Sequence, residues 1–182
     1  MPFTLEREIK LRFASADAAR QAIVRAGAVP FHQRRLQQDF LLDTADGQLR
    51  GASAVLRLRV EPERTLLTFK GPVQAAGMKL RDEIESLVTD AAAILAILDR
   101  TGFRVWFRYE KYREEFLHGD VIAAVDETPV GVFLELEGAE RGITAIAEAL
   151  GYGPEAYLLD SYRSLFVKDC AGRGVPVTNM LF

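Results

Sequence analysis

The stretch Thr4–Phe13, TLEREIKLRF, decides the fold of this chain. Read with the period of two that a β-strand has, one face carries Leu5, Ile9, Leu11 and Phe13. The other face carries two acids followed by two bases: Glu6, Glu8, Lys10 and Arg12. A strand with one solvated polar face is the ordinary interpretation of such a pattern in isolation. The sequences of the other strands are therefore needed to predict whether this charged face contacts water or other charged groups.

The composition favours one globular domain of average polarity. The chain has 182 residues, of which 49% are apolar and 27% charged, which is typical of soluble proteins. We expect a single domain over residues 1–170 and a tail over residues 171–182. The apolar runs are too short for a membrane span, and the charged N-terminal residues do not resemble a targeting segment. We therefore expect no membrane partner.

Two further counts limit the possible functions. The only cysteine, Cys170, excludes an intramolecular disulfide and a cysteine-based metal site, which favours a reducing, cytoplasmic location. The net charge of −3 and the pI near 5.5 give no sign of a nucleic-acid-binding surface, so we expect no nucleic-acid partner.

Periodicity, capping residues and turn signals divide the chain into strands and helices. They predict strands over 4–13, 34–43, 55–61, 65–70, 78–88, 104–117, 121–126 and 132–137. They predict helices over 15–28, 91–100, 143–150 and 155–167, with a loop-like tail after Gly172. Because few strand–helix–strand crossovers appear, the order favours an α+β fold with a mainly antiparallel sheet.

Nearly every predicted strand has one charged face, and like charges pair on it at i and i+2. The acidic doublets are Glu6/Glu8, Glu83/Glu85 and Glu135/Glu137; the basic ones are Arg57/Arg59 and Lys111/Arg113. An ordinary sheet could solvate these faces, or a closed barrel could turn them inward with helices packed outside. Neighbouring like charges are costly without an opposite charge between them. A divalent cation suits the acids, and a polyanion such as a phosphate chain suits the bases.

At this point the motifs match a known family. Glu6-x-Glu8-x-Lys10 resembles the ExExK signature of the CYTH superfamily, the triphosphate tunnel metalloenzymes. That superfamily includes class IV adenylyl cyclases, thiamine triphosphatases and inorganic triphosphatases. The resemblance continues in order through Gln38-Asp39-Phe40, Leu56–Arg59, Leu67–Pro72, Arg81–Glu85, Lys111-Tyr112-Arg113, Asp126, Phe133–Glu137 and Ser161-Tyr162.

The resemblance implies a fold and a set of site residues. The fold would be a mainly antiparallel, eight-stranded closed barrel, a triphosphate tunnel, with helices packed outside; family members also form homodimers. The implied ligands of Mg²⁺ or Mn²⁺ are Glu6, Glu8, Asp126, Glu135 and Glu137. The implied triphosphate-binding residues are Lys10, Arg57, Arg59, Lys70, Arg81, Lys111 and Arg113. The implied catalytic residues are Lys10, Glu83 and Glu85.

The motifs indicate residues that bind a triphosphate, but they do not indicate which group is attached to that triphosphate. Our first hypothesis is a class IV adenylyl cyclase-like activity, which converts ATP to cyclic AMP and pyrophosphate. The alternative is a triphosphatase that hydrolyses the terminal phosphate of thiamine triphosphate or tripolyphosphate. A non-catalytic polyphosphate- or nucleotide-binding module is a third interpretation. The aromatic residues Trp106, Phe107 and Tyr109 are assigned to packing.

Overall fold

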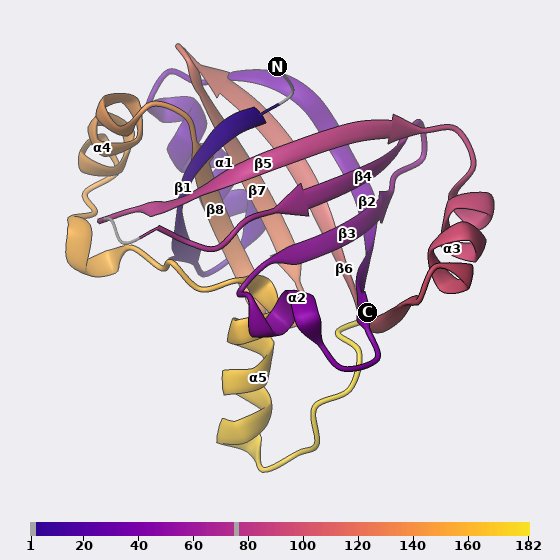
Figure 1. The fold of residues 1–182 in the computed structure, drawn as a ribbon. Helices are drawn as coiled ribbons and strands as arrows, with labels where there is room; N and C mark the ends of the chain where they lie inside the picture. The colour runs from indigo at the N-terminus through magenta and orange to yellow at the C-terminus, as the bar shows by residue number, and fades with distance from the viewer. Residues whose placement is uncertain (1–2, 75–76) are drawn as a thin grey trace.

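The computed structural model describes residues 3–74 and 77–182, which form one barrel with helices around it (Figure 1). The strands are β1 (Phe3–Phe13), β2 (Val29–Thr44), β3 (Val55–Val60), β4 (Thr65–Lys70), β5 (Lys79–Val88), β6 (Phe103–His118), β7 (Val121–Thr128) and β8 (Gly131–Glu137). The helices are α1 (Ala16–Arg25), α2 (Gln48–Gly51), α3 (Ala91–Arg100), α4 (Glu140–Ala149), the 3-10 turn η1 (Pro154–Ala156) and α5 (Tyr162–Arg173).

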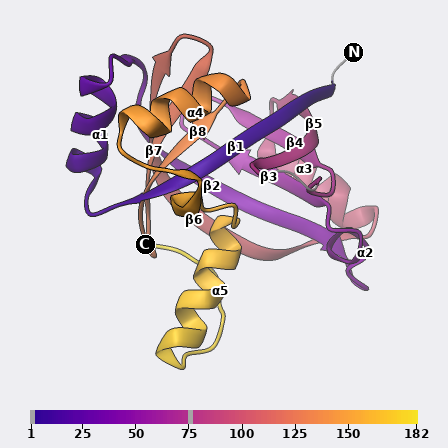
Figure 2. The ribbon, with the colours of Figure 1, turned by 90° about the vertical axis from the view of Figure 1, so that its left-hand side faces the viewer.

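All eight strands belong to one closed antiparallel sheet. The order around the barrel is β1-β5-β4-β3-β2-β6-β7-β8, and β1 pairs with β8 to close it. In Figures 1 and 2, α1 and α4 lie beside the wall formed by β1, β8 and β7, and α5 lies at one end of the barrel. The predicted fold class, an antiparallel eight-stranded closed barrel with helices outside, is confirmed.

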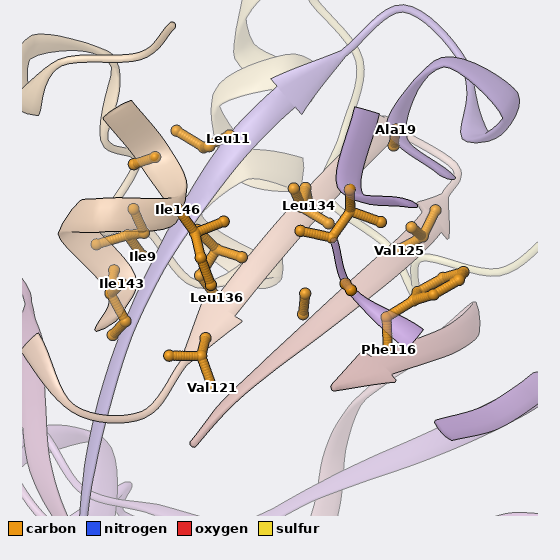
Figure 3. Packing of buried hydrophobic residues seen from close by; sticks show 14 of the residues in the cluster. Ile9, Leu11, Ala19, Phe116, Val121, Val125, Leu134, Leu136, Ile143 and Ile146 are labelled. Carbon is orange, nitrogen blue, oxygen red and sulfur yellow. The ribbon is translucent and has the colours of Figure 1, made fainter. Parts of the chain in front are cut away.

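The main apolar core lies outside the barrel wall, between the sheet and its covering helices. Ile9, Leu134 and Leu136 are fully buried on the outer faces of β1 and β8. Figure 3 shows Ile143 and Ile146 of α4 packing beside this face. Because side chains alternate across a strand, an apolar outer face leaves every second residue of these strands pointing into the barrel.

A second cluster packs α5 against β6 near one end of the barrel. It joins Phe107 to Phe166 of α5, with ring centroids 6.0 Å apart, and it also includes the buried Met180. The backbone amide of Met180 donates to the carbonyl of Arg108 at 3.0 Å. The residues that follow α5 therefore return to the barrel and lie along β6.

Several predicted boundaries are wrong. The last helix starts at Tyr162, where Ser161 accepts a hydrogen bond from the Ser164 amide, and it runs to Arg173 instead of covering 155–167. The short helix α2 was not predicted, and β2 begins at Val29 instead of residue 34. Among the described residues, none of the helices is both long enough and apolar enough to cross a bilayer.

Candidate active site

The inward faces of the strands line a charged tunnel with a cavity volume of about 460 Å³. Nine basic and seven acidic side chains line this cavity. The bases are Lys10, Arg57, Arg59, Arg64, Lys70, Lys79, Arg81, Lys111 and Arg113, and the acids are Glu6, Glu8, Glu83, Glu85, Glu115, Glu135 and Glu137. Every predicted site residue except Asp126 therefore lines one cavity, and Asp126, opposite Arg113 in the register, is hydrogen-bonded to the lining residues Lys111 and Arg113.

The strand register places opposite charges beside one another across the wall. Glu6 is opposite Arg81, Lys10 opposite Glu135, and Lys70 opposite Glu83. Cross-strand pairs of opposite charge stabilise a sheet. Most of the like-charge doublets seen along single strands are therefore compensated by neighbouring strands, a contribution that the sequence pattern alone does not reveal.

The first two acids of β1 are both engaged by bases. Glu6 accepts hydrogen bonds from Lys70 and, at 3.0 Å, from Arg81, while Glu8 accepts from Lys79 and, at 2.7 Å, from Lys10. Burial and Glu135 by themselves raise the pKa of Glu8, but the positive charges of Lys10, Lys79 and Lys70 outweigh them and hold that pKa far below its usual value. Both carboxylates are therefore ionised at neutral pH.

Asp126 has a different environment, since it anchors the basic wall of β6. It is fully buried, and it accepts hydrogen bonds from Lys111 at 2.8 Å, from Arg113 at 2.6 and 2.7 Å, and from the Tyr162 hydroxyl at 2.5 Å. Glu135 shares Arg113 at 2.8 Å and Lys10 at 3.2 Å. Asp126, which accepts four hydrogen bonds, has little acceptor capacity left for a further ligand, whereas Glu135 is paired with two bases, as Glu6 and Glu8 are.

Glu137 is the exception to this pairing. It lies opposite Glu8 in the register of β1 and β8, and among the described residues no basic side chain approaches it closely enough to form an ion pair. One carboxylate oxygen from each of Glu6, Glu8 and Glu137 lies within 4.8 Å of the other two. Three converging carboxylates suit a hard divalent cation such as Mg²⁺ or Mn²⁺. The residues present thus fit a metal ion at this point.

The charge on Glu137 gives the metal-free protein a pH dependence. Burial, followed by the negative charges of Glu6 and Glu135, raises the pKa of Glu137 from 4.5 to about 7. A raised pKa means that the folded chain holds this proton more tightly than the unfolded chain does, so the contribution to stability is complete below pH 4.5 and is lost as the pH rises through 7. We expect the free energy of unfolding to fall across pH 5–7.5, by at most on the order of 3 kcal/mol.

Chemical denaturation of metal-free protein at several pH values measures this dependence, and Glu137→Gln should flatten it. The acids with lowered pKa values, including Glu8 and Asp126, lose their contribution only below this window. The pKa of Lys79 is lowered to about 8, chiefly by burial, so it titrates above the window. An identical slope in wild type and Glu137→Gln would rule out Glu137 as its source.

The remaining predicted residues lie along the β3, β4 and β5 side of the tunnel. Arg59 donates two hydrogen bonds to Asp39, at 2.9 and 3.2 Å, and Arg57 lies 3.4 Å from the same carboxylate. Glu85 accepts from Thr68 at 2.9 Å, and Glu83 lies 3.1 Å from Lys70. Glu83 and Glu85 face the cavity but stand apart from the acidic cluster.

Sequence reasoning missed three kinds of residue in this site. Lys79 lies on the same face as Arg81, so its phase within the strand was a usable signal. Asp39 has the phase of an inward residue, but its partner Arg59 follows only from the β2–β3 register. Tyr162 lies outside the sheet, with its ring centroid 4.7 Å from the Lys111 ammonium. Tyr109 packs in the second apolar cluster, as the sequence predicts, and it also lines the cavity.

A family model, described as the CYTH domain, matches residues 4–154 of this chain. The chain belongs to the CYTH family. This membership agrees with the eight-stranded tunnel and with the ExExK strand, whose three charged residues all line the cavity.

Known relatives share this fold over most of the chain. A protein of Methanocaldococcus jannaschii named as a candidate adenylate cyclase is 29% identical over 134 residues, which cover 73% of this chain and 76% of that protein. The structure of a candidate adenylate cyclase from Vibrio parahaemolyticus superimposes with a TM-score of 0.78 at 19% identity, covering 90% of this chain and 98% of the other. A Hippeastrum protein described as a candidate adenylyl cyclase with a dominant triphosphatase activity gives a TM-score of 0.62 at 16% identity, covering 95% and 97%.

Proposed function

We propose that this CYTH protein is a divalent-metal-dependent enzyme that acts on a triphosphate held in its tunnel, and that it converts ATP to cyclic AMP and pyrophosphate. The observation that carries the proposal is the acidic cluster of Glu6, Glu8 and Glu137 within a wall of bases. Three acids that repel one another are costly unless a cation joins them. Bases beside such a cation suit phosphate oxygens.

The charge balance of the tunnel supports a metal requirement. The nine bases of the lining face seven acids, and two further inward acids, Asp39 and Asp126, pair with bases of the lining. The wall is therefore close to neutral as a whole. A triphosphate carries about four negative charges, so its binding calls for further positive charge, which divalent cations supply.

We assign the metal to Glu6, Glu8 and Glu137, where it would stabilise negative charge on the phosphate oxygens. The bases that grip the phosphates are Lys10, Arg57, Arg59, Lys70, Arg81, Lys111 and Arg113. In the free tunnel each of these groups forms an ion pair with an acid, and we propose that they exchange those partners for phosphate oxygens when substrate enters. Asp126 and Glu135, also predicted as metal ligands, are better placed to orient Lys10, Lys111 and Arg113.

In the cyclase reaction the ribose 3′-oxygen bonds to the α-phosphorus, and the bond from that phosphorus to the bridging oxygen breaks, releasing pyrophosphate. The proton of the 3′-hydroxyl passes to a carboxylate, for which we propose Glu83 or Glu85. Lys10 is buried, and although burial lowers its pKa, the charges of Glu135 and Glu8 raise it above its usual value. Lys10 therefore stays protonated and stabilises charge on the phosphate chain.

A triphosphatase is the second candidate. The tunnel lining offers nine bases to a phosphate chain, and this arrangement does not by itself tie the reaction to the α-phosphorus. The Hippeastrum protein of the same fold is described with a dominant triphosphatase activity. In that reaction water attacks the terminal phosphorus and orthophosphate leaves.

Product analysis separates the two reactions. We expect the purified protein, given ATP with Mg²⁺ or Mn²⁺, to release cyclic AMP and pyrophosphate in equal amounts, and to stop when the metal is chelated. Thiamine triphosphate and tripolyphosphate are tested in parallel. Orthophosphate without cyclic AMP would replace the cyclase by a triphosphatase, and turnover that survives chelation would contradict the metal assignment.

A further inference from the structure

Lys79 is a buried base of the tunnel to which the proposed function gives no role. It is the first residue of β5, and it lies directly opposite Glu8 of β1 in the strand register. Its side chain lines the tunnel, and its ammonium donates a hydrogen bond to Oε1 of Glu8. Only 5% of Lys79 is exposed. A buried ammonium therefore lies against one of the three carboxylates that we assign to the metal.

The same carboxylate oxygen also accepts a hydrogen bond from Lys10. Oε1 of Glu8 lies 2.7 Å from the Lys10 ammonium, so two positive charges share one acceptor atom. The two bases that donate to Glu6, by contrast, take one oxygen each. Like charges in contact repel each other, and a divalent cation bound by Glu8 adds two more positive charges at the same place. Metal binding therefore favours the departure of one ammonium group from Glu8.

The two lysines differ in what else holds them in place. Lys10 also forms an ion pair with Glu135, at 3.2 Å. Among the residues that the structure describes, Lys79 forms an ion pair with Glu8 alone. If Glu8 turns to a metal ion, Lys10 keeps its second carboxylate, whereas Lys79 loses its one acidic partner. Lys79 is therefore the group that leaves.

A displaced Lys79 needs a new acceptor, because a buried ammonium without a partner is costly. Lys79 lines the same cavity as the bases that we assign to the phosphates. Phosphate oxygens of a polyanion in the tunnel are acceptors of the required charge. The arrival of a polyanion therefore lowers the cost of moving Lys79 away from Glu8, and it leaves that carboxylate free for a cation.

We propose that Lys79 is an internal counter-ion, which occupies Glu8 in the free tunnel and makes metal binding depend on the arrival of a triphosphate. The inference rests on the proposed function and extends it to the way in which its two ligands bind. Without a polyanion, Lys79 competes with the cation for Glu8. With one, Lys79 transfers to phosphate oxygens. Because such coupling is reciprocal, metal and triphosphate tighten each other's binding by the same factor, and Lys79 carries a large part of it.

The test measures the Kd of Mn²⁺ at pH 7, from the electron paramagnetic resonance signal of free Mn²⁺, with and without saturating tripolyphosphate. A protein-free titration corrects for the Mn²⁺ that tripolyphosphate itself binds. Lys79→Met removes the charge and keeps an unbranched side chain. We expect the Kd of Mn²⁺ alone to fall about tenfold, because the competing charge is gone. The factor by which tripolyphosphate tightens Mn²⁺ binding should shrink about fivefold or more.

Lys168→Met is the matched control, because it removes the same charge from a side chain that is 67% exposed on α5. Both quantities should stay within about twofold of wild type. Circular dichroism shows whether each variant is folded, and Lys79→Gln, which also removes the charge, carries the test if Lys79→Met is not.

A purely structural role for Lys79 would weaken Mn²⁺ binding in Lys79→Met instead of tightening it. Weaker or unchanged Mn²⁺ binding, or a tripolyphosphate effect equal to that of wild type, would therefore overturn the inference. Binding does not depend on turnover, so an inactive wild type would refute the proposed reaction while these Kd values still decide the inference.

Discussion

Replacing Glu137 by glutamine should lower metal-dependent turnover by about 10²- to 10³-fold, the scale of losing one preorganised electrostatic group at a reacting centre. Glu137 is the one member of the acidic cluster that has no ion-pair partner among the described residues. Its carboxylate is therefore the most available to a cation. Steady-state kinetics across a range of Mg²⁺ concentrations measure the loss, which should be accompanied by a higher metal requirement.

The same substitution should make the metal-free protein more stable at pH 7.5, because it removes a negative charge that Glu6 and Glu135 repel. Glu140→Gln is the control, since this side chain is 67% exposed on α4 and should leave turnover within twofold. Full activity in Glu137→Gln would remove Glu137 from the proposed metal site. Loss of activity together with loss of folding would show a structural role instead.

Replacing Asp126 by asparagine should have the largest effect on stability, a loss of about 3–5 kcal/mol. The change leaves the buried Lys111 without its ion-pair carboxylate, and it leaves the buried Arg113 with Glu135 in place of two carboxylates close by. Urea denaturation at neutral pH measures the loss, and the melting temperature should fall by on the order of 10 °C.

Asp17→Asn is the matched control for this effect, because Asp17 is 81% exposed on the first turn of α1. It should change stability by less than about 0.5 kcal/mol. If Asp126→Asn were as stable as this control, Asp126 would not anchor the basic wall. If a divalent metal ion raised the free energy of unfolding of wild type but not of Asp126→Asn, Asp126 would belong with the metal ligands, as the family resemblance implies.

Alternation is a local property, so the sequence was sufficient to predict strands with one charged face, whereas the closed barrel was implied by the family resemblance. The period of two in Thr4–Phe13 and in Leu56–Val60 marks which side chains face inward, and the same phase recurs on nearly every strand. The helix predicted over 15–28 followed partly from its capping residue Ser15, which does accept a hydrogen bond from the first turn of α1.

The parts that sequence could not supply depend on register and on irregular backbone. The pairing of Glu6 with Arg81, or of Asp39 with Arg59, requires the alignment of strands distant in sequence. The direction of Trp106 depends on a register shift in the β2–β6 pairing that no residue type indicates. The proposed metal ligands depend on register in the same way, because Glu137 lies opposite Glu8, whereas Asp126 accepts hydrogen bonds from three other residues.

The central claim is that Glu6, Glu8 and Glu137 bind a divalent cation that joins a triphosphate in the tunnel. The most direct measurement is Mn²⁺ binding followed by the electron paramagnetic resonance signal of free Mn²⁺, with and without tripolyphosphate. We predict that wild type binds Mn²⁺, that tripolyphosphate tightens this binding, and that Glu137→Gln weakens it at least tenfold in both conditions. Equal Mn²⁺ affinity in wild type and Glu137→Gln, or binding that tripolyphosphate leaves unchanged, would contradict the claim.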